Sequence, residues 1–169
     1  MKCLVVYSSL TGNTKMVAEA IFEIMPEGTD MYPVERAPSS EDYDLIALGF
    51  WADRENADKR AQGYISKIKD KQVALFMTLG AYPDSQHAIN TMENAKALVA
   101  ENNNKVVGEF MCQGKVDPKL IERFSKLPAD NPHGMTPERR ARLEEAAKHP
   151  NIEDLQNAKN TFKSILEKL

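Results

Sequence analysis

Side chains that could bind a phosphate group are concentrated in residues 8–14, which read Ser-Ser-Leu-Thr-Gly-Asn-Thr. Hydroxyls at Ser9, Thr11 and Thr14 can donate hydrogen bonds to phosphate oxygens, and Gly12 lets the backbone approach a ligand closely. One such residue is enough to cap a helix, so this density exceeds what capping alone requires. We therefore predict a phosphate-binding site here, with an ordinary helix cap as the alternative.

The segments on either side of this stretch predict a strand and a helix. Residues 4–7 form an unbroken apolar run, which is typical of a strand buried on both faces. From Val17 onwards apolar residues recur three and four positions apart, which indicates a helix packed on a sheet. The start of such a helix offers unpaired N–H groups and partial positive charge to an anion. Neither Gly-x-x-x-x-Gly-Lys-Ser/Thr nor Gly-x-Gly-x-x-Gly occurs here.

The hexapeptide Ser-Leu-Thr-Gly-Asn-Thr, residues 9–14, directly follows this first predicted strand. It closely resembles the phosphate loop of the flavodoxins, Ser/Thr-x-Thr-Gly-x-Thr. The resemblance covers about residues 2–111 and the last predicted helix. It implies that the chain binds flavin mononucleotide (FMN) and that the loop holds its 5′-phosphate through Ser9, Leu10, Thr11, Gly12, Asn13 and Thr14.

The rest of the chain predicts an α/β fold in one domain, residues 1–169. Further strand-like segments alternate with helical patterns, at 29–34, 45–50, 73–77 and 106–111. Alternation of this kind indicates a doubly wound parallel sheet with right-handed crossovers. It matches the flavodoxin-like arrangement of five strands in the order 2-1-3-4-5. A helical insertion, residues 112–150, separates the fifth strand from the last helix.

The loops expected after the third and fourth strands, 50–56 and 79–85, should meet the phosphate loop at the carboxyl ends of the strands. By the resemblance, each loop supplies one aromatic residue that flanks the flavin ring, here Trp51 and Tyr82. The alternative is that both are packing aromatics at strand ends, and loop 79–85 departs from the family's usual Gly-x-Gly-Asp. The backbone amides expected at the polar edge of the ring are those of Ala52, Gly80 and Ala81.

Composition restricts the class of protein. The chain has 42% hydrophobic and 28% charged residues, a net charge of −3 and two cysteines without a Cys-x-x-Cys motif. We expect a cytoplasmic protein that binds no metal, nucleic acid or membrane. Residues 1–60 hold 6 Lys/Arg and 11 Asp/Glu, a balance of −5, whereas residues 61–169 hold 16 and 14, a balance of +2. An acidic rim near the cofactor would suit a basic docking partner, but it could equally be a solvated face.

The insertion resembles that of a narrower group of flavodoxin-like proteins from anaerobes, in 108–115 and 133–139. Some members of that group look like redox partners of bilirubin reductases. The insertion also carries Arg139, Arg140 and Arg142 on one short predicted helix. We predict that it serves partner recognition and not flavin binding, with coverage of a sheet edge as the alternative.

Together these features predict an FMN-binding electron-transfer protein that passes electrons to a redox partner protein, without catalytic residues of its own. Two alternatives remain: an FMN-dependent reductase of small molecules, quinone-type or tetrapyrrole, and a binding module that has lost the flavin. His87, His133 and His149 are scattered and predict no joint site. Cys112 either approaches the flavin ring or packs as a small buried side chain.

Overall fold

The computed structural model describes residues 1–169 and has the predicted α/β fold. Its parallel strands lie in the order β2-β1-β3-β5-β6, so the predicted order 2-1-3-4-5 is confirmed once the strands are counted without the short β4. These strands are β1 (Cys3–Tyr7), β2 (Asp30–Pro33), β3 (Leu45–Asp53), β5 (Gln72–Leu79) and β6 (Lys105–Gln113). β2 is an edge strand, which suits the proline at its end.

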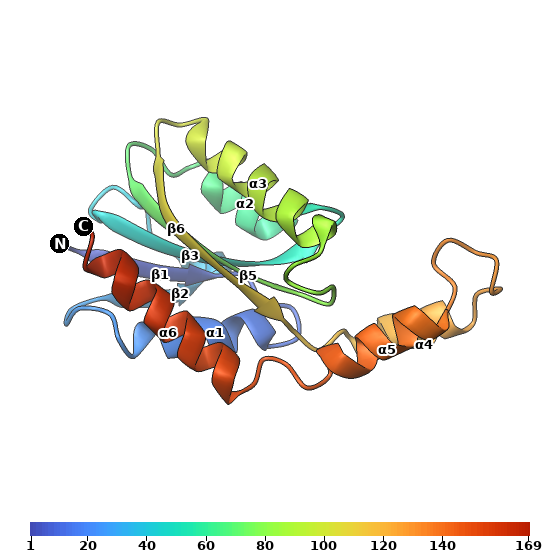
Figure 1. The fold of residues 1–169 in the computed structure, drawn as a ribbon. Coiled ribbons are helices and arrows are strands. Elements are labelled where there is room, and N and C mark those ends of the chain that lie inside the picture. The colour runs from blue at the N-terminus through green and yellow to red at the C-terminus, as the bar shows by residue number, and fades with distance from the viewer.

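Helices cover both faces of the sheet (Figure 1). On one face lie α1 (Asn13–Phe22) and α6 (Ile152–Leu166); on the other lie α2 (Lys59–Ile65) and α3 (Gln86–Ala100). Each face has its own buried cluster, because successive side chains of a strand point to opposite sides. On the α1/α6 face, the rings of Phe76 and Phe162 meet edge to face, with centroids 5.9 Å apart. Burial on both faces explains why the strands read as apolar runs.

The third strand is longer than predicted, and the expected loop 50–56 is wrong. β3 continues to Asp53 and turns back through Arg54 and Glu55 into β4 (Asn56–Ala57), which pairs with it antiparallel. Both turn residues have positive φ, 51° and 61°, as two-residue hairpin turns require. This turn usually carries Asn or Gly, so the Arg-Glu pair gave no sequence signal for it.

The insertion forms two helices, α4 (Pro118–Ser125) and α5 (Pro137–Ala146). The side chains of Asp117 and Thr136 cap them, and a proline begins each one. We call residues 118–146 the arm, because they project beyond the carboxyl ends of the strands (Figure 1). Among the residues of its two helices only Ala146 is buried. The arm covers neither edge strand, so that alternative is wrong. None of the helices is long and apolar enough to cross a bilayer.

Candidate functional site

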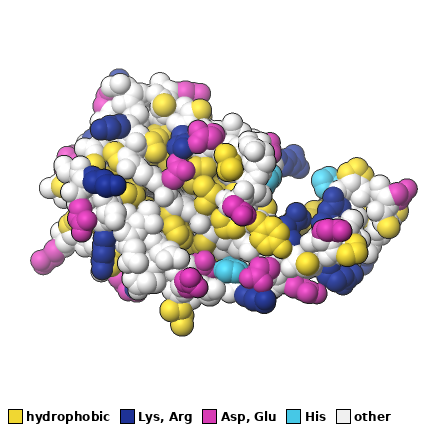
Figure 2. Space-filling view, in the orientation of Figure 1, with side chains coloured by type: hydrophobic (Ala, Val, Ile, Leu, Met, Phe, Trp, Pro, Cys, Tyr) yellow, Lys and Arg dark blue, Asp and Glu magenta, His cyan; other side chains and the backbone are white.

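A cavity of about 650 Å³ lies at the carboxyl ends of the parallel strands, between the sheet and the arm. In Figure 2, hydrophobic side chains and Lys or Arg side chains meet where the arm joins the body of the protein. Every predicted site residue except Gly12 lines the cavity, so the structure brings the three predicted segments together. Gly12 caps α1 directly behind the wall, with a φ of 98° that favours glycine.

The phosphate loop presents free backbone donors at the start of α1. The N-cap makes no side-chain hydrogen bond, and the first helical bond runs from Met16 N to Gly12 O. The N–H groups of Leu10, Thr11, Asn13 and Thr14 donate to no acceptor in the protein. Free N–H groups at a helix start, together with the positive end of the helix dipole, are what an anion needs.

Two hydroxyls of the loop are arranged to donate as well. Ser9 Oγ accepts a hydrogen bond from Gly12 N at 3.1 Å, and Thr11 Oγ1 accepts one from Asn13 Nδ2 at 3.2 Å. A hydroxyl that accepts a hydrogen bond still has its own O–H to donate. Both side chains therefore suit the predicted role toward an anionic oxygen.

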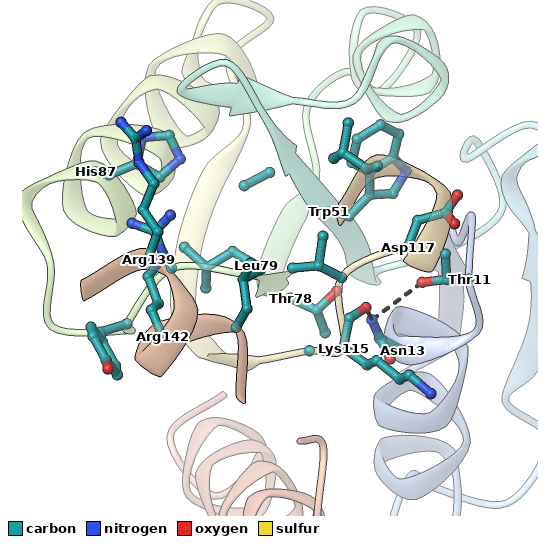
Figure 3. A pocket seen from close by; sticks show the side chains of 18 of the residues that line it. Thr11, Asn13, Trp51, Thr78, Leu79, His87, Lys115, Asp117, Arg139 and Arg142 are labelled. Carbon is teal, nitrogen blue, oxygen red and sulfur yellow. Dashed lines mark hydrogen bonds between the residues drawn. The ribbon is translucent and has the colours of Figure 1, made fainter. Parts of the chain in front are cut away.

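The other polar side chains of the loop form hydrogen bonds within the protein. Thr14 is buried, and its hydroxyl hydrogen-bonds that of Thr78 at 2.8 Å, which joins the start of α1 to the end of β5. The Asn13 carboxamide donates to Thr11 and also to Lys115 O at 2.8 Å. Both of its N–H donors are thus used, and Asn13 can serve a phosphate only through its backbone (Figure 3).

Ser8, at the end of β1, anchors the loop from beneath. Its hydroxyl donates to Asp58 Oδ1 at 2.7 Å, although the two residues are 50 positions apart. Asp58 is 2% exposed and caps α2 by accepting from the N–H groups of Arg60 and Ala61. Ser8 and Asp58 therefore hold the phosphate loop against α2, and neither lines the cavity.

Both predicted ring-flanking aromatics border the cavity. Trp51 lies near the end of β3 opposite Thr78 of β5, and Tyr82 lies on the loop after β5 with 41% of its surface exposed. The indole Nε1 of Trp51 is covered and has no hydrogen-bond partner. An unsatisfied buried donor of this kind costs about 1–3 kcal/mol, which a core tryptophan usually avoids. Trp51 therefore borders the cavity with an unpaired donor, and its contact with a flavin ring stays a prediction.

The loop after β5 also supplies free backbone donors. The N–H groups of Gly80 and Ala81 have no acceptor in the protein, which suits the predicted contact with a polar ring edge. Position 80 has no room for a larger residue than glycine, because a Cβ there would lie 2.5 Å from the Val116 side chain. Ala52 differs from the prediction, since it belongs to β3, opposite Ala57 of β4, and not to a loop.

A short strap, residues 114–117, links β6 to the arm and crosses beside the phosphate loop. Gly114 N donates to Leu79 O at 2.9 Å, and Lys115 N donates to His149 O at 3.0 Å. Lys115 O accepts from Asn13, so one strap residue connects the phosphate loop to the far end of the insertion. Sequence reasoning named neither Lys115 nor Thr78 as a site residue, because their partners Asn13 and Thr14 lie far away along the chain.

The arm forms the remaining wall of the same cavity. It contributes four apolar side chains, Leu120, Phe124, Met135 and Leu143, and four polar or charged ones, His133, Glu138, Arg139 and Arg142. The ring of Phe124 stacks on that of His133, with centroids 5.8 Å apart and planes 15° apart. The insertion therefore borders the predicted flavin site, and its role in partner recognition and not flavin binding stays a prediction.

The three arginines of α5 are not equivalent. Arg139 donates through both guanidinium nitrogens to the carbonyl oxygens of Gly134 and Pro132, so it fastens the loop before α5. Arg142 lines the cavity and forms no hydrogen bond or ion pair. Arg140 is exposed and does not border the cavity. Only Arg142 thus presents a free cation to the cavity from this helix.

The acidic residues of the segment 1–60 do not line the cavity, and the acidic docking rim stays a prediction. The carboxylates that line the cavity are Asp117 and Glu138. His87 also borders the cavity and pairs with Glu55 at 3.5 Å.

Cys112 does not line the cavity: its side chain is 2% exposed and packs on the α1/α6 face. Burial raises the pKa of this thiol, so it is a packing residue.

The base of the arm is held by two contacts of the partly buried His149. His149 lies 2.5 Å from Asp154 Oδ2 through Nδ1 and 3.1 Å from Glu145 Oε1 through Nε2. These carboxylates raise the pKa of His149, with Asp154 the main cause. Asp154 also completes a capping box with Asn151 at the start of α6. The cluster therefore ties the end of α5 to a helix of the core.

Comparison with known proteins gives consistent matches over the whole chain. A family model described as Flavodoxin domain matches residues 4–163. The flavodoxin-like domain-containing protein BilS of Clostridioides difficile (strain CD3) is 32% identical over 175 residues, which cover 99% of this chain and 98% of that protein. Oxidised flavodoxin 2 from Bacillus cereus has a TM-score of 0.64 at 16% identity, over 100% of both chains. A flavoprotein from Lactobacillus acidophilus NCFM, solved in complex with FMN, has a TM-score of 0.55 at 16% identity, over 74% of this chain and 99% of that one.

Proposed function

This chain belongs to the flavodoxin family, and on that premise we propose that it binds FMN and transfers electrons to and from a redox partner protein. The observation that carries the proposal is the group of unpaired N–H donors at the start of α1, inside a cavity bordered by Trp51 and Tyr82. A phosphate needs such donors, and a flat ring needs apolar and aromatic walls.

Different residues would bind the phosphate and the ring of FMN. The N–H groups of Leu10, Thr11, Asn13 and Thr14, with the hydroxyls of Ser9 and Thr11, would hold the phosphate. Trp51 and Tyr82 would flank the ring, and the N–H groups of Gly80 and Ala81 would donate to its polar edge. FMN, when bound, supplies one- and two-electron transfer chemistry.

Titration of the purified chain with FMN and with riboflavin, followed by flavin fluorescence, tests the proposal. FMN should bind at least about ten-fold more tightly, because each charge-assisted hydrogen bond contributes about 1.5–3 kcal/mol. Thr11→Ala should weaken FMN and leave riboflavin almost unchanged. Thr29→Ala, whose hydroxyl bonds Pro26 O far from the cavity, is the matched control. Equal affinity for the two flavins would contradict a phosphate site.

Trp51 provides a second readout of the same proposal. Its emission should fall strongly when FMN binds and return when the flavin is removed. Trp51→Ala should loosen FMN by about 0.5–1.5 kcal/mol beyond the lost buried area. Unchanged tryptophan emission on adding FMN would assign Trp51 to packing.

The partner we propose is a reductase, on the resemblance of 108–115 and 133–139 to flavodoxin-like proteins associated with such enzymes. The continuation of the cavity onto the arm supports a second candidate, an FMN-dependent reductase that acts on a small molecule itself. Steady oxidation of a nicotinamide donor by the FMN-loaded protein and a quinone, with no other protein present, would favour the second. Turnover only after a partner reductase is added would favour the first.

A further inference from the structure

The cavity has two ends of different chemistry. In Figure 3 the predicted phosphate residues Thr11 and Asn13 lie at one end, and Arg139 and Arg142 lie at the opposite end. Thr78, at the end of β5, lies between them. FMN has one phosphate group, which the donors at the Thr11 end would bind, so the arginine end is left without an anion.

Besides its arginines, the arm lines the cavity with four apolar side chains, Leu120, Phe124, Met135 and Leu143. Within this wall Arg142 is partly buried, yet no carboxylate or carbonyl in the protein hydrogen-bonds its guanidinium. Guanidinium groups at partly buried positions usually pair with a carboxylate or phosphate, often through two parallel hydrogen bonds. The neighbouring Arg139, in contrast, donates hydrogen bonds to the carbonyl oxygens of Gly134 and Pro132.

We propose that the arm end of the cavity is a second binding site, for a mainly apolar organic acid whose carboxylate pairs with Arg142. The apolar wall would cover the body of the ligand, and the single free cation would fix its orientation. This goes beyond the FMN site, because none of the residues that carry it belongs to the phosphate loop or to the loop after β5.

The charged side chains at this end of the cavity favour the binding of an anion over that of a cation. Arg139 keeps its positive charge although its hydrogen bonds are satisfied, and it lies beside Arg142 on the cavity wall (Figure 3). Glu138 is the carboxylate that the arm contributes to the lining. Two guanidinium groups against one carboxylate leave a positive balance on the part of the cavity wall that α5 forms, and this balance attracts an anion.

The experiment uses FMN-loaded protein and two probes that differ in charge alone, 2-naphthoate and the neutral 2-naphthamide. Binding of each is measured by calorimetry for the parent protein, for Arg142→Gln and for the control Arg140→Gln. Arg140 is the matched control because it lies on the same helix, is exposed and does not border the cavity.

We expect the parent protein to bind 2-naphthoate more tightly than 2-naphthamide. Arg142→Gln should weaken 2-naphthoate at least about ten-fold, or about 1.4 kcal/mol, and bring it level with 2-naphthamide. Arg140→Gln should change neither. Equal binding of both probes to the parent protein, or equal effects of both substitutions, would overturn the proposal.

Two further outcomes separate this proposal from the FMN site. Displacement of FMN by 2-naphthoate would show a single shared site and overturn the second one, as would an Arg142→Gln variant that loses FMN affinity and keeps 2-naphthoate. If the protein binds no FMN, the proposed function fails, but the same titrations on the flavin-free chain still decide the arm site.

Discussion

The two walls of the cavity are built in different ways. The sheet wall is held by buried hydrogen bonds that reach into the core, between Ser8 and Asp58 and between Thr14 and Thr78. The arm wall buries one residue of its two helices, Ala146, and is held mainly at its base. The fold therefore fixes one wall rigidly, whereas the other depends on a few surface contacts.

This difference matches what each wall would have to do. An electron carrier must hold its cofactor in one position, because the distance and orientation of the ring control transfer. The surface that receives a partner or a second ligand gains from freedom to adjust. Elements with few buried apolar side chains open at low free-energy cost, which describes the arm and not the phosphate loop.

The largest expected contrast comes from the same substitution in each region. Phe162→Ala removes a fully buried ring that packs on Phe76, and it should reduce the free energy of unfolding by about 3–5 kcal/mol. Phe124→Ala removes a partly buried ring of the arm and should cost less than about 1 kcal/mol. Urea denaturation measures both. A similar loss in both variants would show that the arm is part of the cooperative core.

A second test examines the bond that fixes the phosphate loop to β5. Thr14→Val should cost about 1–3 kcal/mol of stability, because the Thr78 hydroxyl is then buried without a partner. Thr78→Val should behave alike, whereas the double variant should recover part of the loss. A double-mutant cycle on the unfolding free energy measures this coupling. Strictly additive losses would mean that the two hydroxyls act independently.

Sequence reasoning predicted the sheet wall well, and the reasons are local. An unbroken apolar run, a polar turn and a helical period specify strand, loop and helix within about twenty residues, and they placed the loop 9–14 at the cavity. The bonds within that wall were not predictable, because Thr14 and Thr78 are 64 positions apart and Asn13 and Lys115 are 102 apart. No local pattern shows which distant partner occupies a hydroxyl or an amide.

For the arm, the local structure was predictable from the sequence, but its position in the fold was not. Its helix starts follow a local pattern, because a capping residue followed by proline, Asp117-Pro118 and Thr136-Pro137, begins α4 and α5. Its direction was not predicted, because helices with little buried surface carry no apolar stripe that reports what they pack against. The sequence therefore did not reveal that α4 and α5 share a cavity with the phosphate loop.

The smallest effect concerns the attachment of the arm to the core, and it depends on pH. The pKa of His149 in the folded protein is raised above its ordinary value of about 6.5, mainly by the hydrogen bond with Asp154 and further by Glu145. The native state therefore holds more protons than the unfolded state between pH 6.5 and the folded pKa. Stability from this cluster is fully present below pH 6.5 and is lost as the pH rises through the folded pKa.

Unfolding free energies measured by urea between pH 5.5 and 8.5 should fall with rising pH in the parent protein and be nearly flat in His149→Gln. The effect should reach the whole domain, because Asp154 completes the capping box of α6, and this helix carries the buried Phe162. Other shifted groups titrate outside this window: the pKa of Glu35 lies below its ordinary 4.5, and the pKa of the Cys112 thiol lies above its ordinary 9.0. The same pH slope in both proteins would mean that the arm is attached without help from the charge on His149, and that the strap, through Lys115 and Asn13, holds it instead.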